Sequence, residues 1–232
     1  MVRIHPDSLS QTVDAVLAAQ FERRPIPAAE AREVGRWIAA RQGLPGAYGG
    51  TFAAFDAERT NGILLFTGER AGSASARHIL GEETCRALRF LDVRDSAVQS
   101  ALERANAGLM GCLERVAGDP RHRNPGFFCC GKCSVGFWRN LLSGGLDRQE
   151  ERLRQGARLL HSLRDGQGGW RRFPFWYTVL ALEEMSSREA SAELEFARAR
   201  IERAAERSGG SLYDARRRAL AGRLAGRTAA AR

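Results

Sequence analysis

The sequence contains no run of about 18 apolar residues, the length that a membrane-spanning helix needs. Its first twenty residues also lack the long apolar core and the cleavage site of a secretion signal. The first absence argues against a membrane span, and the second predicts a cytoplasmic location. In that compartment thiols stay reduced, so we do not expect the five cysteines to form disulfides.

Lysine is nearly absent as well. Lys132 is the only lysine among 36 basic residues, so arginine supplies almost all of the net charge of +9. Positive charge attracts nucleic acid and other anionic partners, but residues 188–207 hold five arginines and five glutamates, which cancel. No recognised nucleic-acid-binding motif occurs, and this disfavours such a partner.

The excess charge concentrates at the C-terminal end, where residues 208–232 hold six arginines against Asp214 alone. We therefore divide the chain into a helical repeat domain over residues 1–207 and a basic amphipathic C-terminal helix and tail over residues 208–232. In this helix Leu212 and Leu220 fall on one side and Arg217 on the other. The helix could dock on its own domain, on a partner or on an anionic surface.

Hydrophobic residues recur at helical spacing through most of the chain. In residues 96–117, for example, Val98, Leu102 and Leu109 mark one stripe, and Asp95 or Ser96 is placed to cap the helix. The same reasoning predicts helices over residues 8–23, 28–41, 75–91, 131–143, 147–163, 174–185, 187–207 and 211–225. Only residues 63–67, a short apolar run bounded by turn residues, favour a strand or a buried loop. The predicted fold class is all-α.

Three breaks between helices share a glycine, any residue and then an aromatic residue: Gly46-Ala47-Tyr48, Gly126-Phe127-Phe128 and Gly168-Gly169-Trp170. Their spacing equals two units and then one unit of about 40 residues, the length of a helical hairpin in a repeat array. This predicts an array of hairpins in which the three aromatic residues occupy equivalent turns.

The segment LRDGQGGW at residues 163–170, with FPFWYT at 173–178 and Ala181-Leu182, resembles the repeat of the terpenoid cyclase and protein prenyltransferase superfamily. There a Gln and a Gly-x-Trp close one helix, and a Pro followed by Thr-x-x-Ala-Leu opens the next. The resemblance covers residues 163–182, with weaker echoes at 41–50 and 125–138. It implies an α/α toroid of helical hairpins, either a partial barrel or one that a second chain completes as a homodimer.

The resemblance also implies an apolar or isoprenoid-type ligand and, if the chain is an enzyme, prenyltransferase-like or cyclase-like chemistry. Neither the Asp-x-Asp-Asp motif of protonating cyclases nor an aspartate-rich diphosphate-binding motif is present, which argues against a standard cyclase. Aromatic residues gather at two loop–helix junctions, and six are predicted to line a ligand cavity: Tyr48, Phe128, Trp138, Trp170, Trp176 and Tyr177. Core packing is the alternative role for these rings, and a non-catalytic scaffold for protein partners is the alternative function.

The segment Phe127–Cys133 carries the most unusual chemistry in the sequence. Cys130 and Cys133 have the two-residue gap that lets two thiolates hold one tetrahedral zinc ion. We predict a zinc site with His122 as third ligand and with His161, Cys129 or Cys112 as the fourth. Two alternatives stay open: the cysteines pack as small hydrophobic residues, or one is a reactive thiol whose pKa Lys132 and a helix start lower.

The other histidines give weaker signals. His5 lies near the terminus, and His78 precedes an apolar pair in a predicted helix. We expect His78 to be exposed or to cap a helix rather than to take part in catalysis.

Overall fold

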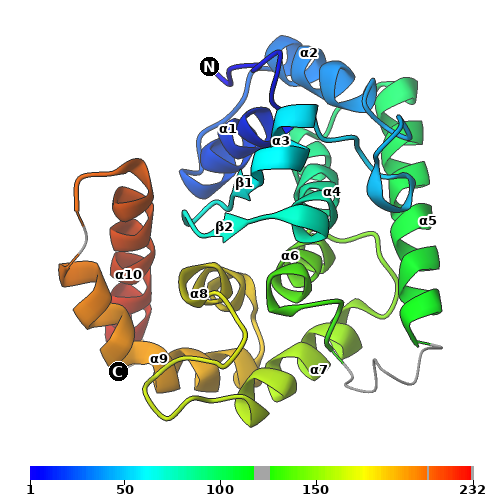
Figure 1. The fold of residues 1–232 in the computed structure, drawn as a ribbon. Coiled ribbons are helices and arrows are strands. Elements are labelled where there is room, and N and C mark those ends of the chain that lie inside the picture. Colours follow the sequence, from blue (N-terminus) through cyan, green and yellow to red (C-terminus); the bar gives the residue numbers. More distant parts are fainter. Residues whose placement is uncertain (118–125, 208, 231–232) are drawn as a thin grey trace.

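The computed structural model describes residues 1–117, 126–207 and 209–230. The chain is 66% helical, and its described residues form ten α-helices and almost no strand, which confirms the all-α fold (Figure 1). The helices are α1 (Leu9–Phe21), α2 (Ala28–Ala39), α3 (Asp56–Asn61), α4 (Ser73–Leu91), α5 (Ser96–Ala117), α6 (Gly131–Leu142), α7 (Gln149–Ser162), α8 (Phe175–Glu184), α9 (Arg188–Glu206) and α10 (Leu212–Ala230).

Besides α3, three short elements lie between α2 and α4. The 3-10 helix η1 spans Tyr48–Gly50, and the strands β1 (Ile63–Leu64) and β2 (Arg70–Ala71) form an antiparallel pair. Residues 63–67, predicted as a strand or a buried loop, form strand β1 over their first two residues and a buried loop over the last three. Helix α3 was not predicted from the sequence.

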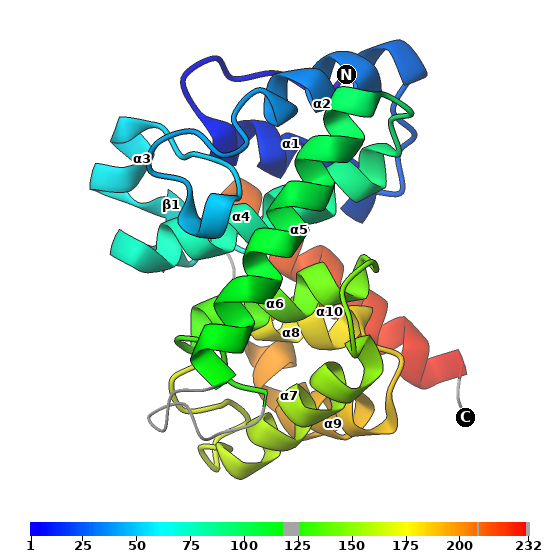
Figure 2. The ribbon, with the colours of Figure 1, turned by 90° about the vertical axis from the view of Figure 1, so that its right-hand side faces the viewer.

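Helices α4, α6 and α8 lie in the middle of the molecule, with α6 packed against both neighbours (Figure 1). Helix α1 packs on α4, α2 packs on α4 and α5, and α7 packs on α6 and α9. Figure 2 shows α5 crossing the front of the molecule from α2 toward α7. The consecutive helices α4 and α5, α6 and α7, and α8 and α9 pair as hairpins, as the repeat spacing predicts. Closure of these hairpins into a toroid stays a prediction.

The Gly-x-aromatic breaks agree with the repeat at two places. Phe128 lies in the loop before α6 and Trp170 in the loop before α8, and both side chains are buried. Tyr48 lies in η1 instead, and α3 and the β1–β2 hairpin separate it from α4. The prediction of equivalent turns is correct for Phe128 and Trp170 and wrong for Tyr48.

Helix α5 shows why the hydrophobic pattern predicts so much of this fold. Its predicted stripe is buried, and Asp95 caps the helix by accepting hydrogen bonds from the amides of Ala97 and Val98. A Cβ at Gly108 would lie 1.8 Å from the carbonyl oxygen of Gly49. Glycine at position 108 therefore lets η1 lie directly on α5.

Buried ion pairs join the three central helices. Arg139 of α6 binds Glu83 of α4 and Glu184 of α8, and the hydroxyl of Tyr177 donates to Glu83. Arg86 adds a second bond to Glu184 at 2.9 Å. Removal of one partner from such a network leaves an uncompensated buried charge, which typically costs about 3–5 kcal/mol. The network therefore fixes how α4, α6 and α8 meet.

Helix α10 docks on its own chain, the first of the three alternatives for the basic segment. The guanidinium of Arg216 forms two bonds of 2.7 Å with Asp14 of α1 and stacks on the ring of Phe66 at 3.9 Å. Leu220 is fully buried, and α10 also contacts α8 and α9.

None of the helices in the described residues combines the length and the apolar character that crossing a membrane requires.

Candidate functional site

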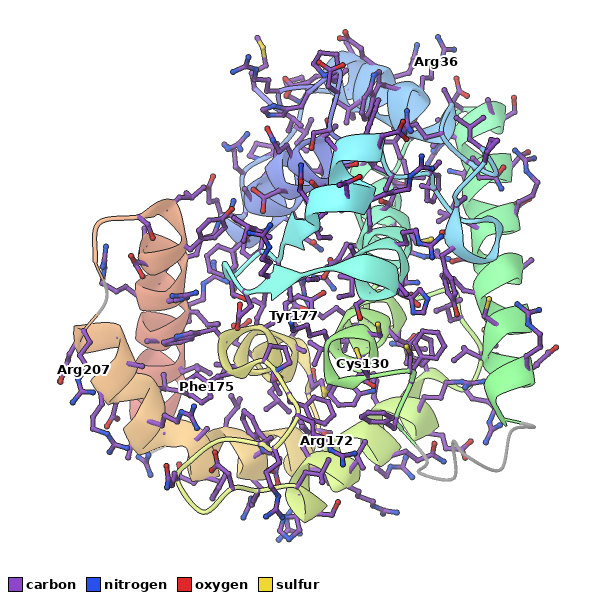
Figure 3. The ribbon with its side chains drawn as sticks, viewed as in Figure 1. Arg36, Cys130, Arg172, Phe175, Tyr177 and Arg207 are labelled. Atoms are coloured by element: carbon purple, nitrogen blue, oxygen red, sulfur yellow. The ribbon has the colours of Figure 1, made fainter. Side chains whose placement is uncertain are left out.

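The cysteine segment Cys129–Cys133 begins α6 at the centre of the molecule, and Figure 3 labels Cys130 there, between α4 and α7. Gly126 starts the approach to it with φ of 87°, and a Cβ at this position would lie 2.6 Å from the backbone of α7. The indole of Trp138 donates to the Gly126 carbonyl at 3.1 Å. These contacts press the loop against α6 and α7 before the first cysteine.

Ser134 holds the next turn of this loop. The amide of Phe128 donates to the Ser134 hydroxyl at 2.8 Å, and this hydroxyl lies 2.8 Å from the Cys130 carbonyl. Phe128 itself is buried. The loop therefore has one fixed path into α6, and the thiols that follow are positioned by it.

Cys129 has φ of 60°, in the left-handed region that residues other than glycine rarely adopt. A conformation of this kind costs on the order of 1–3 kcal/mol, and such strain often marks a functional site. Cys130 follows in an extended conformation, with φ of −149°, and is the N-cap residue of α6. After the reversal at Cys129, its sulfur atom lies within 4.8 Å of the Cys133 sulfur.

The sulfur atoms of Cys130 and Cys133 lie 3.5 Å apart. Cys133 is completely buried, whereas Cys130 is partly exposed and Cys129 reaches the surface. The hydroxyl of Ser75, from α4, lies 3.5 Å from the Cys130 sulfur. Lys132 does not face the thiols, because its ammonium group donates to the Arg70 carbonyl at 2.6 Å.

His78, on α4, lies beside these thiols. Its Nδ1 lies 3.5 Å from the Cys133 sulfur, and the ring of Tyr48 covers it with 3.5 Å between the ring centres. The ligand atoms of His78, Cys129 and Cys133 all lie within 4.8 Å of one another. Burial, and then the charge of Arg77, lower the pKa of His78 to about 4. The imidazole is therefore neutral at pH 7, the form that can bind a metal ion.

The thiols differ in acidity. A hydrogen bond from Cys133 lowers the pKa of Cys130 to about 5, and Ser75 and the first amides of α6 act in the same direction. The pKa of Cys133 is raised, first by this hydrogen bond and then by burial. Burial also raises the pKa of Cys129. Of the three thiols, Cys130 is therefore the one that ionises first.

The distances suit a tetrahedral zinc ion. With Zn–S bonds of about 2.3 Å, the sulfur atoms of a tetrahedron are separated by about 3.8 Å. The separation of 3.5 Å from Cys130 to Cys133, and the equal distance from Cys133 to His78, fall within a few tenths of an ångström of such an edge. Both separations therefore match an edge of such a tetrahedron, and His78, Cys129 and Cys133 are the residues whose ligand atoms all lie within 4.8 Å of one another.

The structure brings together only part of the predicted ligand set. Cys130 and Cys133 are neighbours as predicted, and Cys129, one of the suggested fourth ligands, joins them. His161 lies elsewhere, on α7, where its Nδ1 pairs with Glu193 at 3.1 Å and its side chain is 69% exposed. His122 lies outside the described residues. Cys112, on α5, accepts a hydrogen bond from Arg115 at 2.9 Å.

The expectation for His78 was wrong. Its side chain is 8% exposed and lies inside the thiol cluster, because α4 packs closely on α6. The one sequence signal was the apolar pair Ile79-Leu80 beside it, which places this part of α4 in the core. That signal indicates burial but not a ligand.

The six aromatic residues predicted for a ligand cavity pack against other side chains. Trp138 stacks on Phe173, and Trp170 stacks on Phe175 with its indole donating to Glu193. All but Tyr48, which is half-buried, lie in the core: Phe128, Trp138, Trp170, Trp176 and Tyr177. These contacts agree with the alternative of core packing, and an apolar ligand stays a prediction.

We compared the chain with models of known protein families, with curated proteins and with solved structures, and none of them matches it. Its function must therefore be inferred from the arrangement of its own residues.

Proposed function

We propose that this protein binds one structural zinc ion through four ligands that converge from α4 and the start of α6: His78, Cys129, Cys130 and Cys133. One observation carries the proposal: ligand atoms from segments that are distant in the sequence meet in the fold. Those of His78, Cys129 and Cys133 all lie within 4.8 Å of one another. Chance packing of cysteines as small hydrophobic residues does not require a neutral histidine among them.

The chemistry of the ligands favours zinc over harder cations. Thiolate sulfur and imidazole nitrogen are the ligands of structural zinc sites, whereas magnesium and calcium prefer oxygen. Four protein ligands also leave no open coordination position, which is typical of a structural rather than a catalytic site. The strained backbone at Cys129 supports the same role, because it brings the third thiol to the cluster.

Metal content tests the proposal. The full chain, purified under reducing conditions, is expected to contain one zinc ion, and cobalt(II) in its place should give the intense charge-transfer absorption of a thiolate site. Cys133→Ser should lose both signals, since the hydroxyl is a poor ligand for zinc. Cys112→Ala removes a buried cysteine outside the cluster and should retain them. Wild-type protein that binds neither metal would refute the site, whether or not the variants fold.

The function implied by the sequence resemblance has less support. An apolar or isoprenoid-type ligand would need a cavity, and the aromatic residues expected to line one make ring contacts in the core instead. Exposed apolar side chains such as Leu64 and Leu212 border a surface hollow of about 580 Å³, which agrees with the alternative of a scaffold for protein partners. We keep both as secondary proposals, which a screen of isoprenoid binding and a search for stable partners would separate.

A further inference from the structure

The two cysteines at the start of α6 differ in a way that zinc binding does not require. Cys130 is the N-cap residue and is partly exposed, whereas Cys133 is buried one turn later. Their sulfur atoms lie 3.5 Å apart, compared with about 2.0 Å in a disulfide bond. One thiol is thus open to attack on an external disulfide, and its partner is held behind it.

We propose that Cys130 and Cys133 form a reversible dithiol–disulfide pair that exchanges with disulfide substrates. The substrate class is a disulfide of a peptide or of a small thiol, which supplies the oxidant for the pair. The partly exposed Cys130 is the attacking residue, and the buried Cys133 is the resolving residue.

The exchange proceeds in two steps. The thiolate of Cys130 attacks one sulfur of the substrate disulfide, so that a mixed disulfide forms and the first substrate thiolate leaves. The Cys133 thiol then gives its proton to a departing thiolate and attacks the Cys130 sulfur, and the second substrate thiolate leaves. Two electrons pass to the substrate, which leaves as one thiol and one thiolate that takes a proton from water, while Cys130 and Cys133 become a disulfide.

Cys129 is poorly placed to form a disulfide with Cys130. Adjacent residues have Cα atoms about 3.8 Å apart, which is shorter than the range of about 4.4–6.8 Å found in disulfides. A bond between Cys129 and Cys130 would therefore be strained. The backbone of Cys129 is also already in the strained left-handed region. Cys130 and Cys133, whose sulfur atoms lie 3.5 Å apart, are the pair expected to oxidise.

The exchange would also regulate the proposed zinc site, and this consequence alone rests on the proposed function. A disulfide between Cys130 and Cys133 removes two of the four ligands, so oxidation should expel the ion. Bound zinc should in turn protect both thiols from the substrate. The dithiol chemistry itself follows from the arrangement of the two sulfur atoms and needs no metal.

The test uses the full chain after a chelator has removed any metal. The reduced protein is equilibrated without oxygen in graded ratios of reduced to oxidised glutathione, quenched by alkylation and mapped by mass spectrometry. We expect a disulfide linking Cys130 to Cys133, in a fraction that rises with the proportion of oxidised glutathione and reverses with dithiothreitol. Cys133→Ser should instead accumulate glutathione on Cys130, and Cys112→Ala should behave as the wild type.

The outcomes separate the two proposals. Wild-type protein that never forms the Cys130–Cys133 disulfide, or that links other cysteines in equal amount, overturns the dithiol inference even if zinc binds. A disulfide in a chain that binds no zinc supports the inference and refutes the zinc site. In the zinc-loaded chain, metal release should rise in step with the disulfide, and release without the disulfide would contradict the regulatory consequence.

Discussion

At the residue scale, Glu82 is a carboxylate enclosed in the core. Its side chain is 1% exposed, one oxygen accepts a hydrogen bond from Asn140 at 2.7 Å, and the other has no partner in the described residues. Burial, with a smaller contribution from Glu83, raises the pKa of Glu82 from 4.5 to about 8. The folded chain therefore holds this group protonated at neutral pH, whereas the unfolded chain has it charged.

This difference predicts that the free energy of unfolding falls as the pH rises from about 4.5 to about 8, because folding takes up a proton in that window. The stabilisation from the protonated Glu82 is fully present below pH 4.5 and is lost above pH 8. One such group changes the stability by about 1.4 kcal/mol for each pH unit. Glu82→Gln keeps the size of the side chain and the hydrogen bond from Asn140. It should reduce the difference between the free energies of unfolding at pH 6 and at pH 8, each obtained by chemical denaturation. If Glu82→Gln and the exposed control Glu202→Gln showed the same difference in free energy of unfolding between the two pH values, the prediction would be contradicted.

The sequence predicted the local part of the cysteine cluster and not the distant part. Cys130 and Cys133 are three residues apart at a helix start, so local geometry alone places their thiols on one side. His78 reaches them across 55 positions of the chain, through the packing of α4 on α6. No spacing rule covers such a contact, and His161 was suggested on residue type alone.

At the scale of elements, nine helices were predicted from periodicity and all nine are present. Helix α3 was missed because its six residues carry no apolar stripe. It is held by tertiary contacts of Glu58, which is buried and accepts hydrogen bonds from the hydroxyl of Ser8 at 2.8 Å and the amide of Ser10 at 2.6 Å. Partners that lie far away in the sequence thus decide this element.

The motif that carried the family resemblance is also explained locally. Asp165 accepts hydrogen bonds from the amides of Gln167 and Gly169, both at 2.8 Å, and Gly168 has φ of 82°. Arg164 and Trp170 then bind the same carboxylate, Glu193 of α9. These contacts close the turn between α7 and α8 and tie it to α9. The motif therefore indicates a helical hairpin and does not by itself indicate an activity.

Helix α10 offers a test at this scale. Arg216 is 7% exposed and joins α10 to Asp14 and to the Phe66 carbonyl. Arg216→Met should lower the free energy of unfolding by about 2 kcal/mol, below the range for a fully buried pair because Asp14 is partly exposed. Chemical denaturation measures the loss, with the exposed Arg203→Met of α9 as the matched control. An equal, small effect of the two substitutions would show that α10 contributes little through this contact.

At the scale of the whole molecule, the cysteine cluster joins the two halves of the chain. His78 belongs to α4 and packs with the N-terminal helices, whereas the three cysteines begin α6 and the hairpins that follow. The same interface contains the ion pairs of Arg139 with Glu83 and Glu184. A zinc ion at the cluster would add a second fixed point between α4 and α6, and its binding energy would become folding energy, because the ligands meet only in the native state.

Zinc removal is therefore expected to destabilise the entire fold and not α6 alone. If the ion contributes about 3 kcal/mol, its loss should lower the melting temperature by roughly 6–12 °C for a chain of this length. A strong chelator should produce this shift in the wild type, and added zinc, but not magnesium, should reverse it. Cys133→Ser should melt at the lower temperature with and without the chelator, while Cys112→Ala should respond as the wild type does. The shift should shrink below neutral pH, because protons compete with zinc for the thiolates. Identical melting of the wild type with zinc and with the chelator would mean that α4 and α6 are held by side-chain packing and ion pairs alone.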